Sequence, residues 1–385
     1  MKNFAHLTFC LIAPTLLATT LAPTSTAQTS ENAEKAASPV AYVYVSRPTH
    51  VDGFAASAEG KLTPVKGSPF AGITLSHMSV TRKFLFGPGD DGVTIYGYSI
   101  ASDGALKKVS EIDSSKYHVD CGNIGPTQID SKGATLYNFI ETCEESSHVE
   151  SYKIEENGEL QFLGWDGGGD YDGLSFGLLG NNKYAYFIGG SSMYGTDDFV
   201  FERQSNGLLS GINATVAAPK PENSADVYDA FAVVATDSTD HVAMILQPET
   251  METLFIDGPP QLFSYTADSA GNLNTTNNYK DAPVTLHGGA MSISPTGKLL
   301  AVGGADSRFK GFQVFHFDGG NPIKPYSGLL QSKTEIDQFG WDKSNHLYAL
   351  GGGYLFVYTV TPTSIKEVAT YSIPEASSVI VLNLQ

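Results

Sequence analysis

Two polar side chains offer the reactive groups that ester hydrolysis requires. His287 supplies a base that can activate a water molecule, and Arg308 supplies a cation for the developing oxyanion. Each lies in a loop beside a predicted strand, where the central channel of the predicted fold opens. The alternative is that both are solvated loop residues, because loops are polar by default.

Other charged residues occupy the same two kinds of loop and are candidates for ligand binding. The residues that precede or begin predicted innermost strands are His77, His118, Asp120, Asp170, Asp172, Asp229 and Asp337. Arg47 and His50 lie in a loop after a second strand. The solvated-loop alternative applies to all of them.

The loop WDGGGDYDGLS at 165–175 could bind a metal ion. Its residues Asp166, Asp170 and Asp172 offer the carboxylate oxygens that Ca²⁺ prefers. Its glycines would permit the loop backbone to fold tightly around the ion. The spacing does not match that of an EF-hand loop, so a glycine-rich connector is the alternative. We expect no other cofactor.

Cys121 and Cys143 are the two cysteines that follow the predicted leader. They flank a hairpin whose turn centres near Lys132, and each is eleven residues from that centre. Equal offsets place them opposite each other on antiparallel strands, which predicts a disulfide in an oxidising compartment. A register offset would leave a reduced pair, and a catalytic cysteine with His118 as partner is a further alternative.

A repeated unit positions all of these residues. Short aromatic-aliphatic runs recur at intervals of roughly 42 to 58 residues, in the range of propeller blades with loop insertions. The seven runs are AYVYVS (41–46), KFLFGP (83–88), TLYNFI (135–140), KYAYFIGG (183–190), HVAMIL (241–246), KLLAVGG (298–304) and HLYALGG (346–352). No window of the mature chain shows apolar residues at i, i+3, i+4 and i+7, so a helical solenoid is not expected.

Each run belongs to a unit of four short strands. A strand and a tight turn precede it, as in SISPTGKLLAV, and two strands around a second turn follow it, as in SIASDGALKKV. Four such strands make a propeller blade. The sequence therefore predicts an all-β fold, a seven-bladed β-propeller over residues 40–385. Trp165 and Trp341 sit at repeat positions and are expected to pack between blades.

The two ends of the repeat region complement each other. The first unit starts at AYVYVS without an innermost strand, and the chain finishes with the apolar strand SSVIVLNLQ. We predict that Val379–Leu382 pairs beside Tyr42–Val45 as the innermost strand of the first blade. The C-terminal strand would then close the ring and remove an open edge.

The start of the chain resembles an export signal. Residues 1–27 combine a positive charge, an apolar run over 7–21 and small residues before a predicted cut after Ala27. The apolar run is short for a membrane anchor and is interrupted by proline, which disfavours that alternative. Residues 28–39 are polar and should form a flexible segment. We expect a periplasmic or secreted protein.

Composition narrows the partner classes. The formal net charge is −18, and the basic residues are scattered along the sequence. Nucleic acids require a basic surface, and an anionic membrane repels an acidic protein, so neither partner is expected. No mature segment has the ~18 apolar residues that membrane insertion needs. The remaining expectation is a monomer that binds a small molecule or a protein at its channel face.

The segments AYVYVS, EGKLTPV and SISPTGKLLAV resemble the lactonase family of seven-bladed propellers. That family includes 6-phosphogluconolactonase-like proteins and YVTN-type surface propellers, and the resemblance implies ligand binding at the channel mouth. Where the family has Pro-His-His this chain has Ile124, Gly125 and Pro126, and DYDGLSF replaces a histidine-containing segment of the fourth blade. Ala290 occupies a position where the family has Glu, and Ala305 occupies a position where the family has Arg.

These departures lead to the functional hypothesis. We expect an exported propeller that binds a ligand or partner on its channel face and lacks the usual active-site residues of the family. The alternative is a hydrolase (a lactonase) or an isomerase acting on a lactone or sugar acid, with His287 and Arg308 as its reactive pair. A phosphorylated sugar suits neither the acidic surface nor export.

Overall fold

The structure is a computed structural model in which residues 38–385 form one compact unit. It describes residues 38–117, 123–141, 146–170, 173–191, 195–217, 219, 222–223, 226–250, 258–281, 288–304, 310–332, 334–361 and 363–384. The predicted leader lies outside these residues. No helix in the described part is both long enough and apolar enough to cross a membrane.

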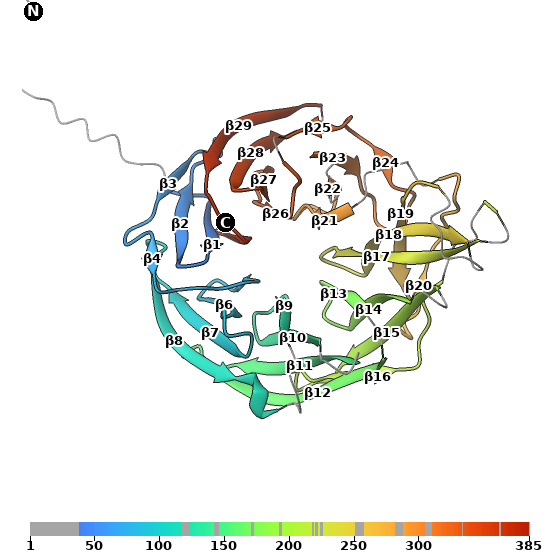
Figure 1. Cartoon of the computed structure of the whole chain (residues 1–385), viewed down its shortest axis with the longest axis horizontal. Coiled ribbons are helices and arrows are strands. Elements are labelled where there is room, and N and C mark those ends of the chain that lie inside the picture. Colours follow the sequence, from blue (N-terminus) through green and yellow to red (C-terminus); the bar gives the residue numbers. More distant parts are fainter. Residues whose placement is uncertain are drawn as a thin grey trace, which may run out of the picture. The chain divides into compact units, whose positions relative to one another are not determined.

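Within the described residues, seven antiparallel sheets are arranged as blades around a centre (Figure 1). The first strand named in each blade is the innermost one, and the others follow outward. Blade 1 contains β30 (Ser378–Asn383), β1 (Ala41–Arg47), β2 (His50–Ala56) and β3 (Leu62–Pro64), and β4 (Phe70–Ala71) also pairs with β2. Blade 2 contains β5 (Ser79–Val80), β6 (Phe84–Pro88), β7 (Thr94–Ile100) and β8 (Leu106–Asp113), and is followed by the 3-10 helix η1 (Ser114–Lys116).

The next three blades follow in chain order. Blade 3 contains β9 (Asn123–Ile129), β10 (Thr135–Glu141), β11 (Ser146–Ile154) and β12 (Leu160–Asp170). Blade 4 contains β13 (Gly173–Leu178), β14 (Tyr184–Ser191), β15 (Gly195–Arg203) and β16 (Leu209–Ile212). Blade 5 contains β17 (Asp226–Thr236), β18 (His241–Thr250), β19 (Gln261–Ala267) and β20 (Leu273–Asn274).

The last two blades complete the ring. Blade 6 contains β21 (Gly288–Ile293), β22 (Leu299–Gly304), β23 (Gly311–His316) and β24 (Lys324–Pro325), and β25 (Leu330–Gln331) also pairs with β23. Blade 7 contains β26 (Gln338–Trp341), β27 (His346–Gly351), β28 (Tyr354–Val360) and β29 (Ile365–Ser372). The predicted seven-bladed propeller is confirmed.

The predicted closure is also confirmed. Strand β30 pairs antiparallel with β1, with Tyr42 opposite Leu382 and Val45 opposite Val379. All four of these side chains are buried. The last strand of the chain therefore supplies the innermost strand that the first repeat lacks, and it pairs with the inner edge of β1.

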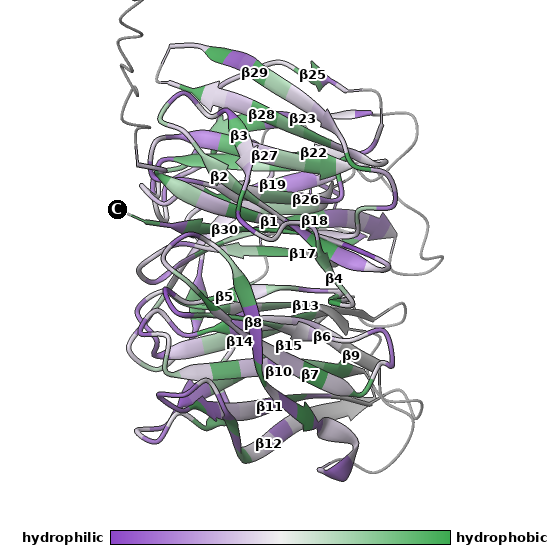
Figure 2. Cartoon of the chain, turned by 90° about the vertical axis from the view of Figure 1, so that its left-hand side faces the viewer, coloured by the Kyte–Doolittle hydropathy of each residue, from purple (hydrophilic) through white to green (hydrophobic). Residues whose placement is uncertain are grey.

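Apolar side chains fill the seams between blades. Each seam contains one hydrophobic cluster of described residues, as Tyr186 of blade 4 packs with Phe263 and Tyr265 of blade 5. In the edge-on view, hydrophobic residues run along strands such as β17, and hydrophilic ones mark the outer strands β12 and β29 (Figure 2). Trp341 is buried as predicted, but Trp165 is 54% exposed, so its predicted core position is wrong. Trp165 lies on outermost strand β12, where no further strand covers it.

Hydrogen bonds also join neighbouring blades. Tyrosine hydroxyls on second strands donate to backbone carbonyls in the outer turn of the next blade: Tyr44 to Gly104 at 2.9 Å, Tyr137 to Gly207 at 2.8 Å and Tyr186 to Gly271 at 2.9 Å. Each bond satisfies a buried hydroxyl that would otherwise cost free energy. The aromatic residue of the second strand therefore joins blade 1 to blade 2, blade 3 to blade 4 and blade 4 to blade 5.

Candidate functional site

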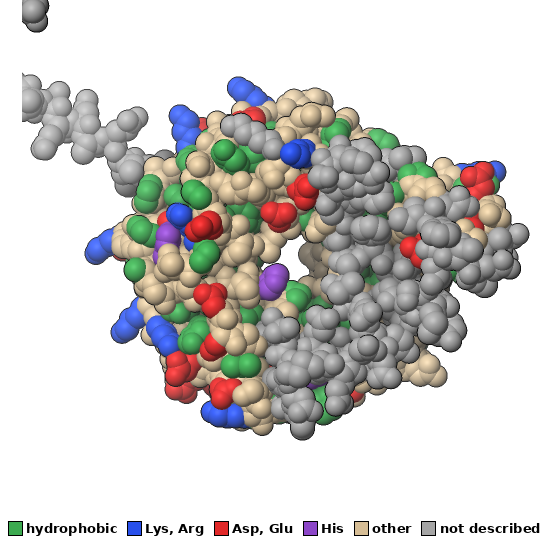
Figure 3. Space-filling view, viewed as in Figure 1, with side chains coloured by type: hydrophobic (Ala, Val, Ile, Leu, Met, Phe, Trp, Pro, Cys, Tyr) green, Lys and Arg blue, Asp and Glu red, His purple; other side chains and the backbone are tan. Residues whose placement is uncertain are grey.

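The propeller has two faces with different loops. The entry face carries the loops that lead into innermost strands and the turns between second and third strands. The hairpin face carries the turns between first and second strands and between third and fourth strands. Figure 3 shows an opening at the centre of the ring, with acidic side chains near it and Lys and Arg mainly at the outer edge. By topology, Arg47, His50, His77 and Asp337 all belong to the entry face.

Blade 1 brings two of the predicted residues together. In the β1–β2 hairpin Arg47 lies opposite His50, and Asp52 lies two residues further on the same strand face. The Asp52 carboxylate is 3.5 Å from Nη1 of Arg47 and 3.6 Å from Nε2 of His50. The buried Nε of Arg47 donates no hydrogen bond to any described residue.

His77 lies in the loop that leads into β5, as predicted, and is half-buried. Its backbone carbonyl accepts a hydrogen bond of 3.1 Å from Thr127 of blade 3, which fixes the loop against the neighbouring blade. Burial lowers the pKa of the His77 imidazole and so favours the neutral ring. The ring forms no hydrogen bond within the described part of the chain. It therefore has one donor and one acceptor available.

Asp337 lies in a different part of the entry face. It lines a pocket of about 430 Å³ together with the β27–β28 turn and the segment before β30, which includes Glu375. Burial of its carboxyl raises the pKa of Asp337, and the charge of Glu335 adds to this, while the backbone N–H of Gly352 opposes it. The pocket is acidic and is separate from the Arg47–His50–Asp52 group.

The predicted metal loop is only partly described. Asp166 uses its carboxylate for the protein's own backbone, accepting from the N–H of Gly167 at 2.8 Å and of Gly211 at 2.7 Å. It thereby ties β12 of blade 3 to β16 of blade 4. Asp170 ends β12, and Asp172 lies outside the described residues. Among the described residues no group of three or more His, Cys, Asp or Glu is placed to hold a metal ion.

Several predicted residues lie where the structure gives no description. These are His118, Asp120, Cys121, Cys143, His287 and Arg308, and for Asp229 only the backbone, within β17, is described. The disulfide and the His287–Arg308 pair therefore stay predictions.

Gly125 and Ala290 are two of the described positions at which the chain departs from the lactonase family. Ala290 lies in β21 and is buried, with its backbone opposite Gly303. A Cβ atom at Gly125, in β9, would lie 2.8 Å from the Phe139 ring and 3.1 Å from the Phe139 carbonyl oxygen. Any side chain at Gly125 would displace its neighbours. Neither position offers a polar side chain to the channel.

A polar cluster on the hairpin face was missed by the sequence analysis. Asp342 accepts hydrogen bonds from His346 Nδ1 at 2.7 Å and from the Tyr348 hydroxyl at 3.0 Å. Its other oxygen accepts from the backbone N–H groups of Ser344 and His346. Asp237 and His241 of blade 5 form the same pair at 2.8 Å. The shared Asp-x-x-x-His spacing across a first hairpin is the signal that could have found it.

Comparison with known proteins supports the fold. No family model matches the sequence, and no curated protein matches it. The periplasmic gluconolactonase PpgL of Pseudomonas aeruginosa superposes with a TM-score of 0.63 at 13% identity, over 90% of this chain and 99% of that one. A protein from Lactobacillus plantarum gives 0.64 at 14% identity, over 89% and 99%.

A third structure, of a candidate 6-phosphogluconolactonase from Bacteroides uniformis, gives a TM-score of 0.57 at 11% identity, over 89% of this chain and 100% of that one. At these identities the comparisons show the fold alone. The predicted resemblance to lactonase-type seven-bladed propellers is thus confirmed at the level of architecture.

Proposed function

We propose that this chain is an exported propeller that binds a ligand or a protein partner on its entry face and does not hydrolyse lactones as the lactonase family does. The observation that carries the proposal is His77. Its imidazole is half-buried, neutral and without a hydrogen-bond partner in the described part of the chain. A side chain that the fold holds in place without using its polar atoms is suited to contact a ligand.

The Arg47–His50–Asp52 group supports the same function. Its contacts of 3.5 and 3.6 Å are too long for hydrogen bonds, and the buried Nε of Arg47 has unused donor capacity. The Arg47 side chain as a whole is 24% exposed, so a bound carboxylate or backbone carbonyl can reach its guanidinium. The geometry therefore favours an acceptor group in the ligand or partner at this end of blade 1.

Catalysis by the family mechanism is disfavoured by the residues present. Ala290 and the Ile124–Pro126 segment lack the carboxylate and imidazole groups that the resemblance would imply there. A hydrolase needs a base near water and a cation near the oxyanion. The alternative function, a lactonase or isomerase acting on a lactone or sugar acid, rests on His287 and Arg308 and on the shared fold of gluconolactonase PpgL.

Hydrolysis measurements separate the two functions. The mature chain is mixed with glucono-1,5-lactone and with 6-phosphogluconolactone, and acid release is followed at constant pH. We expect no rate above the uncatalysed reaction. Turnover on the order of 1 s⁻¹ or faster that is lost in His287→Ala would overturn the proposal in favour of the lactonase.

A stability measurement tests the binding assignment itself. Residues kept for a ligand rather than for the fold should be replaceable at little cost. His77→Ala and Arg47→Ala should each change the free energy of unfolding by less than about 1 kcal/mol. A loss of several kcal/mol in either variant would assign that side chain to the fold instead.

A further inference from the structure

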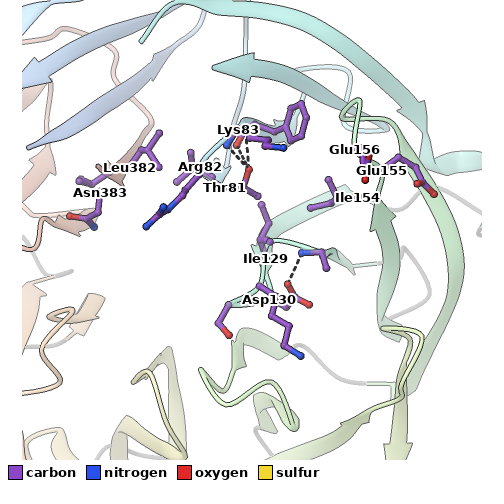
Figure 4. Close-up of a pocket in the computed structure, with 17 residues that line it drawn as sticks. Thr81, Arg82, Lys83, Ile129, Asp130, Ile154, Glu155, Glu156, Leu382 and Asn383 are labelled. Carbon is purple, nitrogen blue, oxygen red and sulfur yellow. Dashed lines mark hydrogen bonds between the residues drawn. The ribbon is translucent and has the colours of Figure 1, made fainter. Parts of the chain in front are cut away.

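A pocket between two blades lies on the hairpin face, on the opposite side of the ring from the entry face. It has a volume of about 690 Å³, within the range of ligand pockets. Its walls are the β5–β6 turn of blade 2, the β9–β10 turn of blade 3, the start of the β11–β12 turn and the end of β30. The pocket therefore spans the seam between blades 2 and 3 and reaches the centre of the ring (Figure 4).

Three basic residues line this pocket: Arg82, Lys83 and Lys132. All three are exposed, and none forms an ion pair with any residue that the structure describes. Arg82 and Lys132 occupy the same turn in successive blades, which brings them to one pocket although they are far apart in sequence. Figure 4 shows Arg82 extending from its turn toward Asn383 at the end of β30.

The acidic residues of the pocket do not cancel this charge. The carboxylate of Asp130 is fully buried and bonds to Arg203 at 2.8 Å and to the N–H of Ala134 at 2.7 Å. Glu155 pairs with Lys153 at 2.7 Å. Glu156 is then the remaining acidic lining residue. A net positive pocket in a chain of net charge −18 favours an anionic ligand.

The inner wall of the pocket is apolar. Val80, Ile129, Ile154 and Val381 line it and are all only partly buried. These side chains come from the ends of innermost strands and of β11, so their positions are fixed by sheet pairing. Covering partly exposed aliphatic side chains with an apolar group lowers the free energy of the complex. The pocket thus combines cations at its rim with an apolar floor.

We propose that this pocket binds a small carboxylate whose body is apolar, such as an aromatic acid. Arg82 and Lys132 hold the carboxylate, and the apolar body lies against Val80 and Ile129. A guanidinium can donate two parallel hydrogen bonds to a carboxylate, and the ammonium adds a second charge. This site is on the opposite face from His77 and Arg47, so the test of this pocket is independent of the proposed function.

The test uses the mature chain and the fluorescent probe 2-naphthoate, titrated at low ionic strength. We expect saturable binding with one probe per chain. Arg82→Glu combined with Lys132→Glu should raise the dissociation constant at least about tenfold, since each charged hydrogen bond is worth that much or more. Lys366→Glu is the matched control, because Lys366 is also exposed and unpaired among the described residues but lies on β29. It should leave the dissociation constant unchanged.

Two further probes separate the parts of the proposal. Acetate has the charge without the apolar body, and 2-naphthalenemethanol has the body without the charge, so both should bind at least about tenfold more weakly than 2-naphthoate. Both turn substitutions are exposed, and an unchanged melting temperature will confirm that the variants are folded. Absence of saturable 2-naphthoate binding, or equal binding by the double variant, would overturn the proposal. Equal binding of acetate would overturn the apolar-body assignment.

Discussion

Blades 7 and 1 are neighbours, and each contains a histidine beside an aspartate, but the two pairs differ in almost every physical respect. On the hairpin face, His346 and Asp342 are 2.7 Å apart, and their side chains are 3% and 0% exposed. On the entry face, His50 and Asp52 are 3.6 Å apart, and their side chains are 20% and 15% exposed.

The difference lies in how far hydrogen bonding is satisfied. Both oxygens of Asp342 accept hydrogen bonds, from His346, Ser344 and Tyr348. Burial and the charge of Asp342 raise the pKa of Tyr348, so its hydroxyl stays protonated and donates. Asp52 accepts no hydrogen bond from a described residue and shares a loose contact with Arg47. The same residue types thus form a fully hydrogen-bonded, buried cluster on one face and a loose, partly exposed group on the other.

Removal of β30 should have the largest effect, because this strand is the innermost strand of blade 1 and also contacts β26 of blade 7. Deleting residues 377–385 exposes the inner edge of β1 and the apolar surface that Val379 and Leu382 bury. We expect the melting temperature to fall by more than about 10 °C. Removing only residues 384–385 is the control and should have little effect. An unchanged melting temperature after the full deletion would contradict the closure.

Asp342→Asn compared with Asp52→Asn tests the two pairs directly. The first substitution replaces one of the two buried carboxylate oxygens with an NH2 donor, so either the side chains of His346 and Tyr348 or the backbone N–H groups lose their acceptor, which should cost about 2–3 kcal/mol of unfolding free energy. The second weakens a loose, partly exposed pair and should cost less than about 1 kcal/mol. Urea unfolding of both variants gives the comparison. Equal losses would mean that both pairs serve the fold.

Two glycines of blade 1 sharpen the same contrast. Gly60 and Gly72 both have positive φ, +78° and +75°, so alanine is strained at either position. A Cβ at Gly60 would lie 2.8 Å from the His346 ring, whereas nothing lies within 4 Å at Gly72. We expect Gly60→Ala to cost about 3 kcal/mol and Gly72→Ala about 1 kcal/mol in urea unfolding. A reversed order would show that His346 is not tightly packed.

The smallest effect concerns the pH dependence of stability. Because burial lowers the pKa of folded His77 below its ordinary value, the unfolded chain binds the proton more readily. The His77 contribution is therefore intact above pH of about 6.5 and is lost as the pH falls below it. His77→Ala should make the fall of the melting temperature between pH 7 and pH 5 shallower. A steeper or unchanged fall in His77→Ala would contradict the assignment.

The fold could be predicted from the sequence because the same pattern of strands and turns recurs in every blade. The repeated second strand, its flanking turns and the complementary chain ends predict seven sheets and their closure. Trp165 was wrongly expected in the core because a repeat position does not tell whether an outer strand is covered.

The sites were less predictable, because they depend on contacts between distant turns. Arg82 and Lys132 look scattered in the sequence, yet equivalent turns of adjacent blades bring them to one pocket. Arg47 and His50 could be assigned to the entry face from topology, but not their shared partner Asp52. Burial, which separates His346 from His50, is likewise a tertiary property.

Carbethoxylation of histidines in the native protein, mapped by mass spectrometry, tests most directly whether the two faces differ in available polar groups. The reagent diethyl pyrocarbonate modifies accessible, unprotonated imidazoles. At pH 7 we predict that His50 and His77 of the entry face are modified, whereas His346, which is 2% exposed and bonded to Asp342, is protected until the chain unfolds. Modification of His346 at the same rate as His50 and His77 would contradict the account.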